Sequence, residues 1–481
     1  MQKQSRYFLG LLSEVKTHPL ITLGFSLFWL WVWLVAQSSF LNSSILVIPL
    51  QGIASWVVPL AAYGAVFLLL GILYATRRIA PQSTLYRVSV GAITSFGAAS
   101  IALFSNFPTT SSTLTSIFVI LGGLLAGGGT ACIHTEWGRL MSGLGSRKTI
   151  IHITSGTVGA MILILLYSLL PPAVEWAILV LLPLVCAAIL IRELKPAPHQ
   201  RQKEDSVGLY LPWRLLPTSF IQGTAFGILQ TILLIVGSTQ ETMLVSVVGS
   251  VLGAIAVFVV VFAFKLDFNQ LIYHVGFVIL AASFVVMAAA GSFFMGGWLV
   301  NALGYRFIDI LMWALCVHLI KHRGLPVNWV FPVATCALIL GQVFGSIVGQ
   351  LVRSAYATQD GGLEALAVIM IFCILSAALF LSNKQNLQKG WGMIRPSDES
   401  EQQGDSFVVS CTLVADGFEL TARELEVFVR LARGQQRALI ASELFLASET
   451  VKTHTRNIYR KMELHSQEEL MRLVKESRSD R

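Results

Sequence analysis

Four basic side chains near the carboxyl end of the chain have the spacing that a helix would gather on one side. They are Lys452, Arg456, Arg460 and Lys461. Residues three or four apart are neighbours on a helix surface. Cations in this arrangement neutralise the phosphates of duplex DNA, and Lys and Arg also reach the acceptors of guanine in the major groove. The pattern suggests DNA binding. Spacing alone leaves open an alternative, a small helical protein-interaction bundle with a solvated basic face.

Two pairs of opposite charges stand inside long apolar stretches. Arg306 and Asp309 lie about halfway along one stretch, and Glu136 and Arg139 have the same spacing near the end of another. Charges at membrane depth are rare and usually face a cavity or each other. For Arg306 and Asp309 the alternatives are a ligand or ion site and a structural ion pair that locks helices together. For Glu136 and Arg139 we favour an ion pair at the membrane interface.

The composition requires that most of the chain face lipid. The 481 residues are 55% hydrophobic and only 12% charged, whereas soluble proteins carry roughly a quarter charged residues. A spanning helix needs about 20 mostly apolar residues. Such stretches occur near 20–38, 52–75, 86–106, 114–135, 150–170, 173–192, 213–237, 243–264, 270–292, 296–319, 327–350 and 363–382. We therefore predict an all-α membrane bundle of about twelve helices over residues 1–382, divided six and six by a polar loop at 193–211.

The charges of the loops predict the orientation of this bundle. Alternate loops hold Arg77 with Arg78, then Arg147 with Lys148, and then the basic residues of the polar central loop, while most of the intervening loops hold no Lys or Arg. Arg353 is the exception. Because Lys and Arg favour the cytoplasmic side, we expect a multi-pass protein of the cell membrane with both ends in the cytoplasm.

Two six-helix halves joined by a central cytoplasmic loop resemble the major facilitator superfamily in topology. The resemblance covers residues 1–382 and implies a ligand site near the bilayer midplane, between the halves. The family's loop between its second and third helices usually carries a Gly-x-x-x-Asp-Arg-type motif. Residues 75–84 of this chain have basic residues there but no acidic one, and this departure weighs against transport.

The composition changes again after Ser382. Residues 383–406 have few large aliphatic side chains and are predicted to be a linker. Residues 407–481 return to the composition of a soluble domain, and they are too polar for another span. The carboxyl end of the chain is therefore predicted to be a separate small domain.

Helix signals follow one another in this last domain. Thr421 and Glu424 form a predicted capping box, and Gly434 fits the end of the helix that the box begins. A short helix is predicted near 436–445. Ser448 is the predicted N-cap of the third helix. A second capping box at Ser466 opens the fourth.

These residues resemble the LuxR-type helix-turn-helix over roughly 418–476. The matching positions are Leu420, Thr421, Arg423, Glu424, Glu426, Val427, Gly434, Ile440, Ala441, Leu444 and the run from Ser448 to Met462. The resemblance implies four helices, of which the third enters the major groove and the fourth pairs in a homodimer. It places at the base edges Lys452, Thr453 and Arg456, and near the phosphates Thr450, His454, Arg460 and Lys461. It places Val451 and Ile458 in the core.

Two departures from the LuxR pattern bear on the scaffold of the domain. The segment from Gly434 to Leu439 replaces the family's usual Gly-x-Ser/Thr-Asn-Lys-Glu, which affects how the scaffold helix meets the DNA backbone. Gln467 stands where the family usually has Arg, and we expect a weaker contact within the domain there.

Together these features predict a membrane-bound transcriptional regulator of bacterial type, a one-component sensor. Its expected partners are double-stranded DNA, the lipid bilayer, a second copy of the chain and an unknown small-molecule ligand. One alternative is a membrane transporter with an appended regulatory DNA-binding domain, and another is a tether that only localises a constitutive DNA binder. The sequence shows no nucleotide-binding loop, catalytic triad or metal-ligand cluster, so we expect no enzyme and no cofactor.

Overall fold

The structure, a computed structural model, divides into two compact units, Met1–Ser397 and Asp398–Arg481. The residues that it describes are 13–37, 57–75, 83–106, 112–194, 211–236, 239–264, 266–289, 294–323, 325–356, 362–382, 396, 411, 414–415, 418, 420–432, 434–444 and 447–479. Of the predicted linker, 383–406, only Pro396 is among them, and residues 195–210 of the predicted central loop also lie outside the described residues. The domain limits themselves therefore remain a prediction.

The first unit is almost entirely helical over its described residues. Its elements are α2 (Pro19–Gln37), α3 (Val57–Ala75), α4 (Thr84–Asn106), α5 (Ser112–Leu144), α6 (Ser146–Tyr167), α7 (Pro172–Glu193), α8 (Leu215–Val236), α9 (Thr239–Phe264), η1 (Gln270–Gly276) with α10 (Phe277–Ala289), α11 (Phe294–Arg323), α12 (Val327–Tyr356) and α13 (Gly362–Leu381). Every predicted span falls on one of these helices, and the all-α prediction is confirmed. Among the described residues nine helices are long and apolar enough to cross a membrane, so the count of about twelve crossings remains a prediction.

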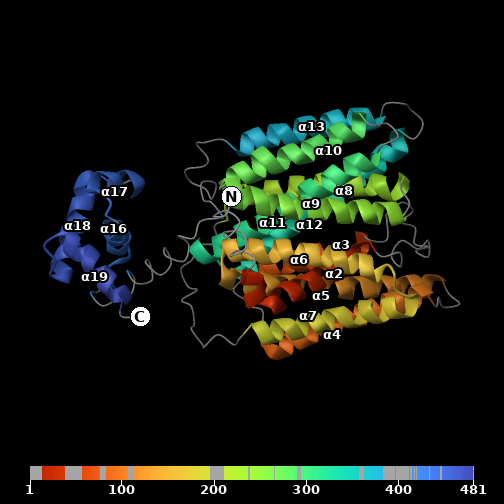
Figure 1. Ribbon diagram of the computed structural model, residues 1–481, viewed down its shortest axis with the longest axis horizontal. Helices are drawn as coiled ribbons and strands as arrows, with labels where there is room; N and C mark the ends of the chain where they lie inside the picture. Colours follow the sequence, from red (N-terminus) through yellow and green to blue (C-terminus); the bar gives the residue numbers. More distant parts are fainter. Residues whose placement is uncertain are drawn as a thin grey trace. The chain divides into compact units, whose positions relative to one another are not determined.

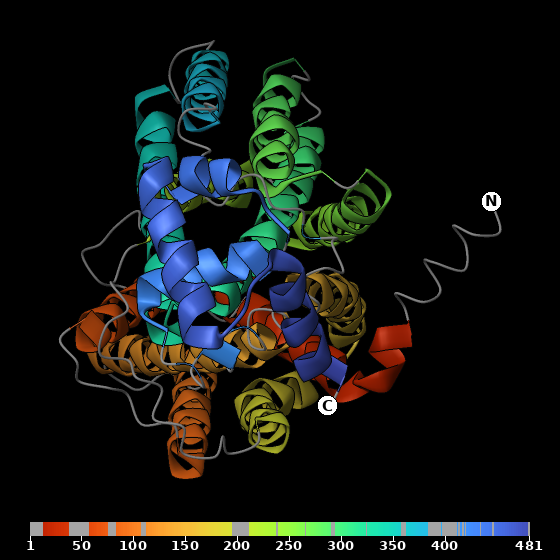
Figure 2. The same ribbon diagram turned by 90° about the vertical axis from the view of Figure 1, so that its left-hand side faces the viewer.

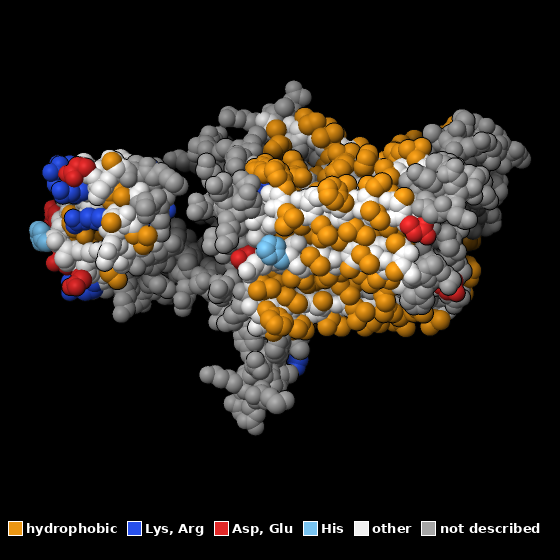
Figure 3. Space-filling view, turned by 90° about the horizontal axis from the view of Figure 1, so that it is seen from above, with side chains coloured by type: hydrophobic (Ala, Val, Ile, Leu, Met, Phe, Trp, Pro, Cys, Tyr) orange, Lys and Arg blue, Asp and Glu red, His pale blue; other side chains and the backbone are white. Residues whose placement is uncertain are grey.

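Large apolar side chains cover the outside of this helical unit. Leu68, Phe96, Phe372 and Leu379 are each more than half exposed, and Figure 3 shows how densely such side chains cover the face in view. Soluble proteins rarely expose contiguous apolar patches of that extent. Helices also satisfy their own backbone hydrogen bonds, as a hydrocarbon surrounding requires. The surface is therefore that of a protein embedded in a bilayer.

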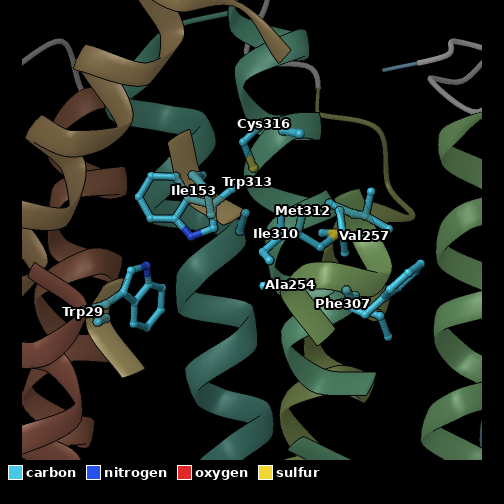
Figure 4. Packing of buried hydrophobic residues seen from close by; sticks show 14 of the residues in the cluster. Trp29, Ile153, Ala254, Val257, Phe307, Ile310, Met312, Trp313 and Cys316 are labelled. Carbon is cyan, nitrogen blue, oxygen red and sulfur yellow. The ribbon is translucent and has the colours of Figure 1, made fainter. Parts of the chain in front are cut away.

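Helices α2–α7 and α8–α13 form two groups in the first unit (Figure 1), and Figure 2 shows most of these helices nearly end-on. The two groups meet where α3 packs against α12 and where α6 packs against α9. Figure 4 shows part of the shared core, to which α2, α6, α9 and α11 contribute Trp29, Ile153, Val257 and Trp313. The division into two halves that was predicted from the sequence is thus visible in the packing.

Within the second group, α8 and α12 approach each other unusually closely. A Cβ atom added at Gly223 would lie 2.0 Å from the carbonyl oxygen of Leu338, and one added at Gly341 would lie 2.1 Å from that of Phe220. Because both obstacles are backbone atoms, only glycine fits at these two positions. Small residues at membrane helix contacts allow this kind of approach, and here they place α8 and α12 side by side.

The described residues of the second unit include four helices: α16 (Ala422–Ala432), α17 (Arg437–Leu444), α18 (Ser448–Met462) and α19 (Gln467–Ser479). Their fully buried core includes Val427, Phe428, Ile440, Val451, Ile458 and Leu470. The predicted four-helix domain is confirmed, and so is the expectation that Val451 and Ile458 belong to its core.

Most local signals in the second unit behave as the sequence suggests. The Thr421 N–H donates to Glu424 Oε2 at 2.9 Å, and the Glu424 N–H donates to Thr421 Oγ1 at 3.3 Å, which completes the predicted capping box. Gly434 follows α16 with a φ of 79°, the left-handed conformation that glycine adopts without strain. The prediction for Ser448 is wrong. The N-cap of α18 is Ala447, with extended backbone and no side-chain cap, so Ser448 is already helical.

Candidate functional site

A cavity of about 160 Å³ lies inside the first unit, where its two groups of helices meet. One side of its lining comes from α2, α3, α5 and α6, and the other comes from α8, α11 and α12. The polar members include Tyr63, His134, Gln222, Arg306, Asp309 and Gln342. A mostly apolar cavity with a few convergent polar groups is the usual form of a small-molecule site.

Arg306 and Asp309 form the ion pair that their spacing predicts, and both line this cavity. Arg306 Nη1 donates to Asp309 Oδ2 at 2.9 Å, and the two side chains are only 9% and 5% exposed. The guanidinium carbon of Arg306 also lies 4.3 Å from the centre of the Trp29 ring, a cation–π contact between the two halves. The ion pair lies within α11 and faces the cavity, and the Arg306 contact with Trp29 links α11 to α2. A ligand role for it remains a prediction.

A second polar contact in the lining joins Tyr63 of α3 to His134 of α5. The Tyr63 hydroxyl and His134 Nδ1 are hydrogen-bond partners, and the His134 ring stacks on Trp313 with centroids 4.5 Å apart. Trp313 also contacts Phe331 of α12, with centroids 4.9 Å apart. Figure 4 shows the indole rings of Trp29 and Trp313, which both line the cavity. Aromatic rings from both halves therefore surround the polar groups.

Glu136 and Arg139 belong to a larger network than the simple interfacial pair expected from their spacing. Arg87 Nε donates to Glu136 Oε2 at 2.7 Å, and Arg139 Nε donates to Glu136 Oε1 at 3.1 Å. Arg139 Nη2 also donates to Asn328 Oδ1 of α12 at 2.8 Å. Glu136 is buried, because α5 continues past the predicted span end at residue 135 as far as Leu144. Neither residue is among those described as lining the cavity, so the network ties α4, α5 and α12 together.

Several cavity residues escaped the sequence analysis. Gln222, Gln230 and Gln342 line the cavity, and Gln342 Nε2 donates to the Tyr305 hydroxyl at 2.9 Å. Glutamine inside an apolar span is a polar group at membrane depth, and that signal could have singled them out. Their convergence on one cavity depends on packing between the halves, which periodicity within one span does not reveal.

In the second unit, the predicted base-contacting residues lie on the outer face of α18. The side chains of Lys452, Thr453 and Arg456 are exposed. Lys452 Nζ lies 3.3 Å from Glu449 Oε1, but both side chains are more than half exposed, and an ion pair of this kind holds its charges weakly. Thr453 Oγ1 donates to the backbone oxygen of Glu449 at 3.0 Å. The exposed face therefore presents two cations and a hydroxyl that are available to a partner.

The predicted phosphate-contacting residues divide into two groups. Thr450 and Arg460 are exposed and His454 is half-buried, so all three can approach a nucleic-acid backbone beside α18. Lys461 differs, because its Nζ donates to Glu424 Oε2 of α16 at 2.8 Å. Lys461 therefore supports the scaffold of the domain, and a phosphate contact by it remains a prediction.

The Glu424 carboxylate is the centre of this scaffold. Burial raises its pKa, but hydrogen bonds from Lys461 and from Thr421 outweigh burial, and the net pKa is lowered from its ordinary value of 4.5. The carboxylate thus joins the start of α16 to the end of α18. This contact holds the end of α18 against the start of α16.

Gln467, which stands where the family usually has arginine, makes contacts within the domain, and whether they are weaker stays a prediction. Its Nε2 donates to the backbone oxygens of Leu431 and Gln435 at 2.9 and 3.0 Å. The Leu431 oxygen lies in the last turn of α16, and the Gln435 oxygen follows the end of the helix. Carbonyl groups at a helix end lack helical partners. One amide group therefore fastens the start of α19 to the end of α16.

No metal centre is apparent in the part of the chain that the structure describes. Among those residues, no three His, Cys, Asp or Glu side chains gather closely enough to hold a metal ion.

Comparison with known proteins identifies the second unit. Residues 419–474 match the family described as bacterial regulatory proteins, luxR family. A curated protein of Haemophilus influenzae, described as a nitrate/nitrite response regulator protein homolog, is 47% identical over 47 residues. The matched stretch covers 10% of this chain and 23% of that protein. The carboxyl end of the chain is thus a LuxR-type helix-turn-helix domain, as predicted.

The first unit is similar in fold to solved membrane transporters. The human organic anion transporter MFSD10 matches with a TM-score of 0.55 and 13% identity, over 77% of this chain and 99% of that chain. The fucose:proton symporter FucP of E. coli matches with 0.51 and 14%, over 76% and 98%. A bacterial homologue of the iron transporter ferroportin matches with 0.52 and 14%, over 76% and 97%. At this identity the likeness shows the fold alone: the first unit shares the fold of these transporters.

Proposed function

We propose that this protein is a membrane-bound transcriptional regulator whose membrane unit senses a small molecule. In this proposal α18 reads specific sites on double-stranded DNA, and two copies pair through α19. A ligand bound in the cavity between the two groups of helices changes the dimerisation or the accessibility of the DNA-binding domain. The protein is a multi-pass protein of the cell membrane with both ends in the cytoplasm, since only there does the domain meet DNA.

The observation that carries the proposal is the union of two sites in one chain. A luxR-family domain exposes Lys452 and Arg456 on its third helix, and a separate membrane unit encloses a cavity with a buried ion pair. A tether without a ligand needs no such cavity. Charges inside a membrane unit are costly and usually serve a function.

The DNA interface follows from the chemistry of the exposed face of α18. Lys452, Thr453 and Arg456 would face base edges, where cations reach guanine acceptors. Thr450, His454 and Arg460 would contact phosphates and set the register. Lys461 would contribute mainly through Glu424, which holds α18 against α16.

The sensing mechanism follows from the position of the ion pair between the halves. A ligand shifts a conformational equilibrium only if it binds one state better than the other. Arg306 contacts Trp29 of the opposite half, so a ligand that engages Arg306 acts on a contact between the two halves. A change in that contact would favour one arrangement of the halves.

The test combines transcript profiling with single substitutions. Profiling a deletion strain identifies the target genes and the inducing condition. Arg306→Gln and Asp309→Asn should then each reach the membrane at normal abundance but no longer change target transcription on induction. Lys452→Ala should lose regulation under all conditions. If both membrane variants lose abundance and the double variant regains it, the pair is structural and the sensing role is wrong.

A transporter with an appended regulatory domain is the second candidate. The fold of the first unit favours it, because the solved proteins with this fold include a symporter and an organic anion transporter. Uptake into vesicles separates the two candidates. Saturable, gradient-driven movement of a compound that also controls the target genes would support transport, and control of the genes without such movement would support sensing alone.

A further inference from the structure

The charge of the cavity lining restricts what can bind there. Among the described residues that line the cavity, Asp309 is the acidic one and Arg306 is the basic one besides His134, and Arg306 and Asp309 form a salt bridge with each other. The lining is therefore balanced. A ligand with a net charge would add an uncompensated charge to a buried site, which is costly. A ligand without net charge, either neutral or zwitterionic, avoids that cost.

The ion pair leaves hydrogen-bonding capacity for a ligand on both partners. One guanidinium nitrogen meets one carboxylate oxygen, Nη1 to Oδ2, whereas an Arg–carboxylate pair is frequently bidentate. Arg306 Nε is buried and has no hydrogen-bond partner among the described residues. Arg306 therefore keeps donors and Asp309 keeps an acceptor. A ligand with a donor and an acceptor close together would complement both.

The remainder of the lining suits a flat, apolar body. Aromatic rings line the cavity on both sides, from α2 with Trp29 and Trp33 and from α11 with Tyr305 and Trp313. Such rings stack on or pack edge-to-face against another ring. A volume of about 160 Å³ is close to that of an engineered protein cavity of about 150 Å³ that binds benzene. One ring with a short polar side chain has that size.

We propose that the cavity binds a small aromatic compound without net charge, with its hydrogen-bond donor on Asp309 and its acceptor on Arg306. This inference rests on the proposed function, which takes the cavity as the site where the ligand is sensed. It adds the chemical class of the ligand, which follows from the balanced ion pair and the surrounding rings.

The test uses four probes that share a phenyl ring and a two-carbon chain and differ in charge. They are 2-phenylethanol (neutral), phenylalanine (zwitterionic), phenethylamine (cationic) and 3-phenylpropionate (anionic). Binding to the purified full-length protein in nanodiscs is measured as a shift in melting temperature and by tryptophan fluorescence. At least one of the two probes without net charge should bind about tenfold more tightly than either charged probe. Equal binding of a charged probe, or binding of none of the four, would overturn the proposal.

Substitution of either charge should reverse the preference. Arg306→Gln leaves Asp309 alone and should favour phenethylamine by about tenfold, while Asp309→Asn leaves Arg306 and should favour 3-phenylpropionate by a similar factor. Arg139→Gln is the matched control, because it alters the other pair of the same spacing outside the cavity. An unchanged preference in the two cavity variants would contradict the assignment. The panel on the unsubstituted protein stays decisive if a variant fails to fold.

This test and that of the proposed function fail in different ways. Probe binding is measured without DNA and without transcription. If no probe binds but Arg306→Gln and Asp309→Asn abolish induction, the ligand class is wrong and the sensor stands. If a probe without net charge binds as expected but neither variant changes transcription, the site is real and the sensor is wrong.

Discussion

At the scale of single residues, the exposed face of α18 has the clearest consequences. Lys452→Ala and Arg456→Ala should each weaken binding to a specific operator by about 1–3 kcal/mol if they reach base edges. Binding to unrelated DNA should fall much less, because phosphate contacts dominate it. Titration of the full-length protein in nanodiscs with operator and scrambled duplexes measures the affinity for the operator and the affinity for unrelated DNA.

The matched control for these substitutions is Arg430→Ala, which removes the same charge from α16, outside the helices that are proposed to read DNA and to pair. It should leave the ratio of specific to unrelated binding unchanged. An operator affinity that does not respond to Lys452→Ala would show that α18 meets DNA in another register.

Glu424 gives a residue-scale prediction on pH. Because its pKa is lowered in the folded domain, the ionised carboxylate stabilises the fold at pH values above 4.5, and that stabilisation is lost as the pH falls through the folded-state value. Glu424→Gln should therefore cost about 1–3 kcal/mol at neutral pH, and the difference should shrink in acid. Urea unfolding of the fragment 407–481, followed by circular dichroism at several pH values, measures it.

Glu426→Gln is the control for Glu424→Gln. Glu426 pairs with Arg423, but the two side chains are 47% and 42% exposed, and exposed ion pairs contribute at most about 1 kcal/mol. Its substitution should change the unfolding free energy little at any pH. A loss at neutral pH as large as that of Glu424→Gln would contradict the central place given to Glu424.

At the scale of elements, the close approach of α8 and α12 predicts which glycines are irreplaceable. Gly223→Ala and Gly341→Ala each force a methyl group against a backbone oxygen, and overpacking of this kind costs about 1–3 kcal/mol. Gly143→Ala, where an added Cβ meets nothing within 4 Å, should be neutral. The melting temperature of each purified full-length variant tests the difference. Equal values for all three variants would mean that the two helices separate readily.

The elements also show how far the sequence alone can go. Apolar length predicted each helix of the first unit, and the capping box of Thr421 and Glu424 with Gly434 predicted the limits of α16. The pairs at Arg306 and Glu136 could be predicted because both members stand on one helix. The full lining of the cavity could not be predicted, since His134, Gln222 and Gln342 come from three helices whose contact depends on packing. The bond from Lys461 to Glu424 could not be predicted either, because it joins residues that are distant in sequence.

At the scale of the whole molecule, the alternation of loop charges leads to a prediction on sidedness. A DNA-binding domain works only in the cytoplasm, and basic loops favour the same side. Reporter fusions after residue 110 and after residue 205 should therefore lie on opposite sides of the membrane, with the second one cytoplasmic. Each position is fused in turn to two reporters, one that is active only outside the cytoplasm and one that is active only within it. Either location then gives a positive signal.

A third fusion, at the carboxyl end, serves as the control, because regulation of transcription requires it to be cytoplasmic. If the fusions after 110 and 205 report the same side, the helices between them cross the membrane an even number of times, and the division into two six-helix halves is wrong. If they report opposite sides but the carboxyl end lies outside, the domain does not reach DNA and the proposed regulator fails. We expect the fusion after residue 110 outside the cytoplasm, and the fusions after residue 205 and at the carboxyl end inside it. This combination is compatible with about twelve crossings, the number that a span length of roughly 20 residues suggests. It is also the combination that a regulator acting from the membrane requires.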